Sequence, residues 1–436
     1  MLLSTGVPAR RAVASLVLAS VALAGCAEQG AAPAEPAPSR PAPAATSAAE
    51  PAPPASAQPT AQPTAQPTAQ PTLPSPPAPK RRRYVPDKEV WQRAQPAHGH
   101  NRDNPLAERR WGVYRGDLEQ TWRAYQGAGG ETRRLLGTIA LRPKALWLGE
   151  WSGPPERIGS VVREYVENAS GGDPKVLVQL AVFRMDPWEH AVCGGRAPSR
   201  GAQDVYRRWI TNAARALGRQ HAAVVVQPDL PFWWCSNRAV TSSLVTHAVR
   251  AFSAQPNTSV YLDAGAADWS STPQVGAPRP SQAADLLLAN GIADARGFAL
   301  NATHYVGAEE SVAYGAELVR ILRERGVPGV HFIVDTAQNG NGMIWPEVEP
   351  EGSRVNDNAR VCGSTADRRG CVTLGIPPTS RVGDPRWGLS PEVSREAKRH
   401  VDGFLWFARP WLFMQAHWRG PDRALRLARS TSWPAP

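Results

Sequence analysis

Short apolar runs alternate with longer amphipathic stretches along most of this chain, and this alternation limits the possible folds more than any other feature. The runs are mostly β-branched or aromatic, which is typical of strands buried in a parallel sheet. They lie at residues 145–151, 175–183, 222–227, 260–264, 297–303, 330–334 and 403–407. Stretches with helical spacing lie between them, at residues 158–168, 203–217, 239–252 and 309–325. The sequence therefore predicts an α/β fold.

Polar or aromatic side chains follow nearly every one of these runs. Asp229 follows the third run, Asp263 closes the fourth and Asp335 ends the sixth. In an open doubly wound sheet, only the strands beside a switch point should carry such residues. In a barrel, the carboxyl ends of all strands surround one site. We therefore expect a barrel, and the lack of a GxGxxG or GxxxxGK loop after the first run argues against nucleotide chemistry.

The first 25 residues have the features of a secretory signal peptide. Arg10 and Arg11 precede an apolar stretch that ends in Leu-Ala-Gly-Cys at Cys26. This ending resembles the bacterial lipobox, in which the cysteine becomes the acylated N-terminus, although ordinary cleavage beside an incidental cysteine is the alternative. We expect a lipoprotein anchored through Cys26 to the outer face of the bacterial cytoplasmic membrane.

Residues 26–87 form a Pro/Ala-rich segment that is predicted to be a disordered linker. Four consecutive Ala-Gln-Pro-Thr units occupy residues 57–72, and proline at this density favours an extended, semi-rigid tether. All 16 tryptophans lie beyond it, so residues 88–436 are expected to form the globular domain. The formal net charge of +11 is partly carried by the basic cluster at residues 80–83, and we expect no nucleic-acid partner.

Cysteine usage agrees with export. Besides Cys26 the chain contains Cys193, Cys235, Cys362 and Cys371. An even number in a secreted chain favours two disulfides. Metal binding is the alternative, but the spacings are not of the CxxC type and the histidines are scattered, so we expect neither a metal nor another cofactor.

Acidic residues at the ends of the strands, with indoles beside them, suggest a polysaccharide site. Pyranose rings stack on aromatic side chains, and glycosidic cleavage uses a carboxylic acid and a carboxylate. Trp147, Trp151 and Trp269 lie beside strand ends, whereas Trp209 lies within a predicted helix and is expected to fill the core.

Several segments resemble glycoside hydrolase family 6, the inverting cellulases. Residues 226–229 (VQPD) resemble its Glu-Pro-Asp motif, and residues 261–269 are similar to its Tyr-Leu-Asp-Ala-Gly-His-x-x-Trp block. Residues 331–342 (HFIVDTAQNGNG) resemble its Asp-Thr-Ser-Arg-Asn-Gly-Asn-Gly segment. Other similar blocks occur in the family's order at residues 145–149, 297–301, 309–315 and 401–407. The resemblance implies a distorted seven-stranded (β/α) barrel.

The resemblance also implies roles for individual residues. Asp229 falls on the general acid and Asp263 on a supporting carboxylate. Cys193 and Cys235 fall on a disulfide between two loops. The expected substrate-binding residues, some taken from the family and some from their place at strand ends, are Trp147, Trp151, Trp269, Asn301, Tyr305, Trp406 and Arg409.

The chain departs from the family where water is activated. The family has Asp before the cysteine that corresponds to Cys193, whereas this chain has Val192, so Asp186 or Glu189 is expected to supply that carboxylate. Residues 408–415 (ARPWLFMQ) replace a family segment that carries Lys, Glu and Asp, and Arg409 could supply the charge of the Lys. Gln227, Ala266 and Gln338 replace the family's Glu, His and Arg, and the Cys362/Cys371 pair is more closely spaced than the family's second disulfide.

We therefore expect a lipid-anchored, monomeric glycosidase that cleaves β-1,4-glucan polysaccharide or oligosaccharide with inversion and contacts the membrane only through its anchor. The alternative is a glycan-binding lipoprotein that keeps the cleft but has lost the base. A purely structural envelope lipoprotein would fit the tether, but it would not explain Asp229 and Asp263.

Overall fold

Seven parallel strands form the central sheet of the protein. The computed structural model describes residues 100–185, 195–271 and 275–433. Within these residues the sheet has the order β1-β2-β3-β4-β5-β6-β9. The strands are β1 (Leu146–Gly149), β2 (Val178–Phe183), β3 (Ala222–Val226), β4 (Thr258–Asp263), β5 (Gly297–Leu300), β6 (His331–Asp335) and β9 (Val401–Leu405). The predicted α/β fold with seven strands is confirmed.

Several residues named in the predictions lie outside the described part of the chain. They are Cys26, Asp186, Glu189 and Cys193, together with the predicted signal peptide and linker. No helix among the described residues combines the length and apolar character needed to cross a membrane.

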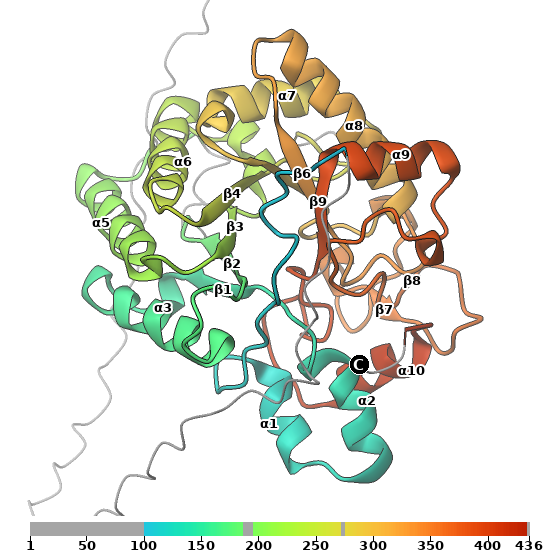
Figure 1. The fold of residues 1–436 in the computed structure, drawn as a ribbon. Coiled ribbons are helices and arrows are strands. Elements are labelled where there is room, and N and C mark those ends of the chain that lie inside the picture. The colour runs from blue at the N-terminus through green and yellow to red at the C-terminus, as the bar shows by residue number, and fades with distance from the viewer. Residues whose placement is uncertain (1–99, 186–194, 272–274, 434–436) are drawn as a thin grey trace, which may run out of the picture. The chain divides into compact units, whose positions relative to one another are not determined.

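The sheet curls into a distorted, partial barrel with helices outside it (Figure 1). The helices between successive strands are α3 (Pro155–Ser170), α5 (Arg200–Leu217), α6 (Arg238–Ser253), α7 (Pro280–Ala289), α8 (Ala308–Glu324) and α9 (Pro391–His400). In the described part of the chain, three more helices lie outside the strand repeat, namely α1 (Gln120–Gly127), α2 (Gly130–Ala140) and α10 (Asp422–Ser430). Polar caps set several helix starts: Ser199 accepts a hydrogen bond from Ala202 N at the start of α5, and Asn237 accepts one from Val240 N at the start of α6.

Alternate residues of the strands face two different cores. In β3, Val224 packs against the outer helices, whereas Ala223 and Val225 face the barrel interior. Small interior residues such as Ala223 and Ala299 leave room for the large rings of the same core, including Trp147. Both sides of the sheet are therefore apolar, which explains why the strands read as continuous apolar runs.

The sheet is open between its first and last strands, β1 and β9, and we call this opening the seam. Among the described residues, β1 and β9 are not paired with each other as strands. Ala145 N, just before β1, donates a hydrogen bond of 2.9 Å to Trp406 O, just after β9. Side chains that follow β1 and side chains that follow β9 can therefore meet at the carboxyl end of this seam.

Two strands end earlier than the apolar runs indicate. The first stops at Gly149 because Glu150–Ser152 form a turn of 3₁₀ helix. The fifth stops at Leu300 because Asn301 adopts a left-handed conformation, with φ of 73°, which a strand cannot continue. Both turns redirect the chain at the edge of the sheet where the polar residues gather.

A buried ion pair stabilises the sheet at the amino-terminal ends of its strands, opposite the edge where the polar residues gather. Asp402, in β9, is fully buried and accepts hydrogen bonds from Arg296 Nε (2.9 Å), Tyr261 Oη (2.7 Å) and Asn101 Nδ2 (2.8 Å). Arg296 lies just before β5, and Asn101 belongs to the segment that precedes the barrel. The Asp402 carboxylate therefore links β9 to β4, to the residue before β5 and to the segment that precedes the barrel.

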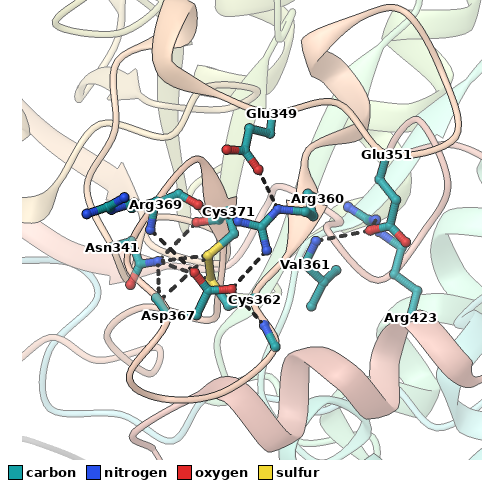
Figure 2. Close-up of polar contacts among 11 residues, drawn as sticks. Asn341, Glu349, Glu351, Arg360, Val361, Cys362, Asp367, Arg369, Cys371 and Arg423 are labelled. Carbon is teal, nitrogen blue, oxygen red and sulfur yellow. Dashed lines mark hydrogen bonds and ion pairs between the residues drawn. A yellow bond between two sulfur atoms is a disulfide. The ribbon is translucent and has the colours of Figure 1, made fainter.

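A small stapled sheet lies in the long connection between β6 and α9. Its two strands, β7 (Arg360–Val361) and β8 (Cys371–Val372), are joined by the Cys362–Cys371 disulfide, which confirms that predicted bond. Figure 2 shows Arg360 between Glu349 and Asp367, at 2.6 and 2.8 Å. Asp367 lies close to both sulfurs, but because these are bonded to each other they are not available as thiolate ligands for a metal.

Candidate active site

Asp229 lies at the carboxyl edge of the sheet, two residues after the turn that ends β3. It has a left-handed backbone with φ of 66°, and Gln227 has φ of 54°. Such conformations are uncommon for residues other than glycine and often occur at functional sites. Thr303 Oγ1 donates a hydrogen bond of 2.8 Å to Asp229 Oδ1. The carboxyl group is thus held by the loop that follows β5 and remains partly exposed.

A second carboxyl group supports Asp229 from beneath. Asp263, the last residue of β4, is fully buried, and its Oδ2 accepts a hydrogen bond of 2.8 Å from Asp229 N. Burial, reinforced by the nearby charge of Asp229, raises the pKa of Asp263 well above its ordinary value. The pair therefore retains a proton at a pH where isolated carboxyl groups have lost theirs. A partly exposed acid beside a buried, proton-retaining partner is suited to proton donation.

The positively charged side chain of Arg409 lies at the side of the site that is next to the seam. The guanidinium of Arg409, which follows β9, lies 4.1 Å from the centre of the Trp147 ring. Burial lowers the pKa of Arg409 to about 9, and the charge of Asp229 partly opposes this shift. Arg409 is therefore still a cation at neutral pH, close to the Asp229 carboxyl group.

Asp335, the last residue of β6, holds the turn that presents Arg409. Its Oδ2 accepts hydrogen bonds from Phe407 N at 2.5 Å and Ala408 N at 2.6 Å, and its Oδ1 accepts one from Ala337 N at 2.8 Å. These contacts fix the backbone immediately before the guanidinium. Burial nevertheless raises the pKa of Asp335 to about 7.

This shift predicts a pH effect on folding. Because the folded pKa of Asp335 lies above its ordinary 3.8, the folded state holds this proton more tightly, and the stability it contributes is lost as pH rises from about 4 to about 7. We expect the free energy of unfolding, measured with urea, to fall over this range by on the order of 1–3 kcal/mol more in the natural protein than in Asp335→Asn. An equal pH dependence of the free energy of unfolding in the two proteins would contradict the raised pKa of Asp335.

Aromatic rings line the other side of Asp229. The imidazole of His304 is stacked between Trp269, with ring centres 4.8 Å apart, and Trp345, at 4.6 Å. His304 Nδ1 lies 2.7 Å from Asp268 Oδ1, and Asp268 Oδ2 accepts a hydrogen bond of 2.7 Å from Trp345 N. The loops after β4, β5 and β6 are thereby tied together beside the acid.

The family model for glycosyl hydrolases family 6 matches residues 111–387, which include both carboxyl groups and the loops around them. The chain belongs to glycosyl hydrolase family 6. The family and enzyme class expected from the sequence are confirmed by this membership.

Named relatives of this family-6 chain include two endoglucanases. Endoglucanase 1 of Streptomyces halstedii is 32% identical over 249 residues, which cover 56% of this chain and 73% of that protein. Endoglucanase A of Cellulomonas fimi is 28% identical over 248 residues, 56% of this chain but about half (51%) of that protein. The endoglucanase Cel6 of Mycobacterium tuberculosis, solved with a methyl-cellobiosyl-4-deoxy-4-thio-β-D-cellobioside, shares the fold, with a TM-score of 0.55 at 24% identity over 75% of this chain and 99% of that chain.

The structure brings several predicted residues of this family-6 chain together. Asp229, Asp263, Trp147 and Arg409 gather around one site, whereas Trp269 is 5% exposed and stacks on His304. Trp151 is 55% exposed beside the seam and is the predicted indole with the most accessible face.

Three residues of the family-6 chain that were predicted to bind substrate are buried in the structure. The Asn301 side chain is fully buried and bonds to Val306 O and Asp335 O. Tyr305 Oη donates to Asn356 O, Trp406 Nε1 donates to Ile376 O, and each side chain is 1% exposed. The polar atoms of these side chains are bonded within the protein, and their role in sugar binding stays a prediction.

Three other residues near the site of the family-6 chain were not predicted from the sequence. Thr303 lies in the loop after β5 and Asp268 in the loop after β4, as the predicted residues lie after strands. Asp357 was also missed; it lies before β7, burial raises its pKa and His304 is near enough to lower it in part. Cys235 is disulfide-bonded, but because Cys193 lies outside the described residues, the predicted pairing stays a prediction.

Proposed function

We propose that this family-6 chain hydrolyses β-1,4-glucan chains with inversion at the anomeric carbon and that Asp229 is the general acid. The observation that carries the proposal is the Asp229–Asp263 pair, with Thr303 on the acid, at the carboxyl edge of a family-6 sheet. The named endoglucanase relatives support the choice of substrate.

In the proposed reaction Asp229 transfers its proton to the glycosidic oxygen as the bond from that oxygen to the anomeric carbon breaks. A water molecule forms the new bond from the opposite face of the sugar, and a second carboxylate accepts its proton. Inverting enzymes hold the two carboxyl groups about 6.5–9.5 Å apart to make room for this water. We assign the second role to Asp186 or Glu189, which lie outside the described residues; Asp357 is a further carboxyl group on this side of the sheet.

The test is release of reducing ends by the purified protein from cello-oligosaccharides, mixed-linkage β-glucan and cellulose. We expect steady release from the soluble substrates. Of Asp186→Asn, Glu189→Gln and Asp357→Asn, we expect only the first or second to lower kcat by about 10²-fold or more. Absence of release from all three substrates would overturn the proposed hydrolysis.

The second candidate function is glycan binding without cleavage. It is favoured by residues 408–415, where Arg409 stands in a segment without any carboxyl group. A binding protein would show tryptophan fluorescence changes with cello-oligosaccharides and no release of reducing ends, so the same preparation distinguishes the two functions.

We also propose that the protein is a lipoprotein held at the outer face of the bacterial cytoplasmic membrane by acylated Cys26. The lipobox-like ending and the proline-rich segment after it support this location. Replacement of Cys26 by Ala should release the protein from the membrane fraction; unchanged membrane association would refute the anchor.

A further inference from the structure

The turn after β9 contains two consecutive residues with a left-handed backbone, although neither is glycine. Met414 has a φ of 51° and Gln415 a φ of 52°. Such conformations are uncommon for residues with a side chain, and they persist where the surrounding contacts require them. Met414 N donates a hydrogen bond of 3.1 Å to the Oδ1 of Asn358, which lies just before β7. The Gln415 side chain that follows is buried, with 8% of its surface exposed.

The Gln415 amide connects the turn after β9 with the loop after β5. Its Oε1 accepts a hydrogen bond of 3.4 Å from Arg409 N, and its Nε2 donates one of 3.4 Å to Thr303 O. Both bonds are longer than the usual distance of about 2.9–3.0 Å, so each is weak by itself. Because the amide is buried, each bond also provides a partner for a polar atom that has left water. The backbone at Thr303 is therefore tied to the turn that presents Arg409.

The hydroxyl group of Thr303 in turn orients the acid. Thr303 Oγ1 donates a hydrogen bond of 2.8 Å to Asp229 Oδ1, which is an ordinary length for a bond between two oxygen atoms. A protonated carboxyl group has one O–H and one carbonyl oxygen, and a hydroxyl donor favours the carbonyl oxygen as its acceptor. The bond to Oδ1 therefore favours the proton on Oδ2, the other oxygen of Asp229.

Charged groups on two sides of Asp229 act on the same proton. Asp263 lies beneath it, and an ionised Asp263 would favour the protonated form of Asp229, whereas the cation of Arg409 favours the ionised form. The Thr303 hydroxyl also favours the ionised form, because a carboxylate accepts a stronger hydrogen bond than a neutral acid does. Removal of this hydroxyl should therefore let Asp229 keep its proton to a higher pH.

We propose that Thr303 and Gln415 are positioning residues for proton donation by Asp229. Gln415 holds the backbone of Thr303, and the Thr303 hydroxyl orients the carboxyl group so that Oδ2 carries the proton that is donated. The inference rests on the proposed glucanase function with Asp229 as the acid. It also gives residues 408–415 a role in that function: this segment has no carboxyl group of its own and acts on the acid through Gln415.

The test combines kinetics with titration of the Asp229 carboxyl group. In Thr303→Val, which removes the hydroxyl and keeps the shape, we expect kcat on cello-oligosaccharides to fall about tenfold with KM unchanged. The alkaline limb of the kcat/KM profile should move up by about half a pH unit or more. Carbon NMR of protein labelled at its aspartate carboxyl carbons, assigned with Asp229→Asn, should show the same displacement of the Asp229 titration.

Two further threonine variants separate positioning from a general effect on folding. Thr303→Ser keeps the hydroxyl and should restore both kcat and the pH profile. Thr211→Val removes a half-buried hydroxyl on α5 that lies 3.2 Å from His247 Nε2, and it should change neither. An unchanged pH profile and an unchanged titration in Thr303→Val would overturn the role of Thr303, even if kcat falls.

The role of Gln415 is tested by its coupling to Thr303. Gln415→Met should lower kcat by about threefold and displace the titration in the same direction by less, because the lost bonds are long. The double variant with Thr303→Val should be no slower than Thr303→Val alone, since both changes act through one hydroxyl. Losses that multiply in the double variant would overturn the connection through Gln415. A displaced titration in a protein that releases no reducing ends would support the orientation of Asp229 and contradict the glucanase function.

Discussion

Replacement of Asp229 by Asn should lower kcat on cello-oligosaccharides by about 10²–10⁴-fold with little change in KM. The carboxyl group is the partly exposed member of a proton-retaining pair, and the N–H protons of an amide are too weakly acidic to be transferred to the leaving oxygen. The loss should shrink to about tenfold or less for a substrate whose leaving group is a dinitrophenolate, because that group departs without protonation.

The fold should survive this change. Asn Oδ1 can still accept the hydrogen bond from Thr303, and the bond to Asp263 comes from the backbone N–H of residue 229. Asp285→Asn, an equivalent change on the outer helix α7 where the carboxylate pairs with Arg325, serves as the matched control and should keep full activity. Equal losses on both kinds of leaving group, or near-natural activity in Asp229→Asn, would remove Asp229 from the acid role.

Replacement of Asp402 by Asn should lower the free energy of unfolding by about 3–5 kcal/mol, because it removes the charge that compensates a largely buried guanidinium. The Arg296 side chain is 17% exposed and meets the fully buried Asp402 at 2.9 Å. The side chain of Asn also places an N–H₂ group where Asp402 has one of its carboxylate oxygens. The donor that bonded to that oxygen, Tyr261 or Asn101, then loses its acceptor.

Asp103→Asn is the matched control for this prediction. Asp103 bonds the same guanidinium at 3.1 Å, but its side chain is 75% exposed, so its loss should cost less than about 1 kcal/mol. Urea unfolding of the three proteins measures both effects, and kcat per folded molecule should stay unchanged. Similar losses from the two variants would show that burial of the pair does not determine its importance.

The strands and the position of Asp229 at the carboxyl edge were predictable from local pattern, whereas its role as the acid came from the family resemblance and stays a prediction. Buried parallel strands must be apolar on both faces, and a residue after such a strand must lie at one edge of the sheet. Asp229 and Asp263 are placed by these two conditions alone, before their contact at 2.8 Å is known.

The sequence does not determine which way a side chain points at that edge. Trp406 follows Leu405 and precedes Phe407, both of which face the barrel interior, so alternation turns its ring to the neighbouring core. Asn301 has the left-handed backbone that ends β5, and this turn buries its amide against Val306. Neither the φ angle nor the burial is encoded in the residue type.

The remaining omissions depend on contacts distant in sequence. Asp268 and His304 meet across two loops, and Trp345 joins them from a third. Arg409 was predicted as a substitute cation, but its unbonded Nε and its stacking on Trp147 appear only when β1 and β9 meet at the seam. Such sites require the tertiary structure.

The central claim is direct displacement by water with Asp229 as the acid, and the configuration of the first product tests it most directly. Proton NMR during hydrolysis of a β-linked cello-oligosaccharide should show the new reducing end first as the α-anomer, followed by mutarotation, and no such signal with Asp229→Asn. Initial appearance of the β-anomer would show retention and contradict the proposed mechanism.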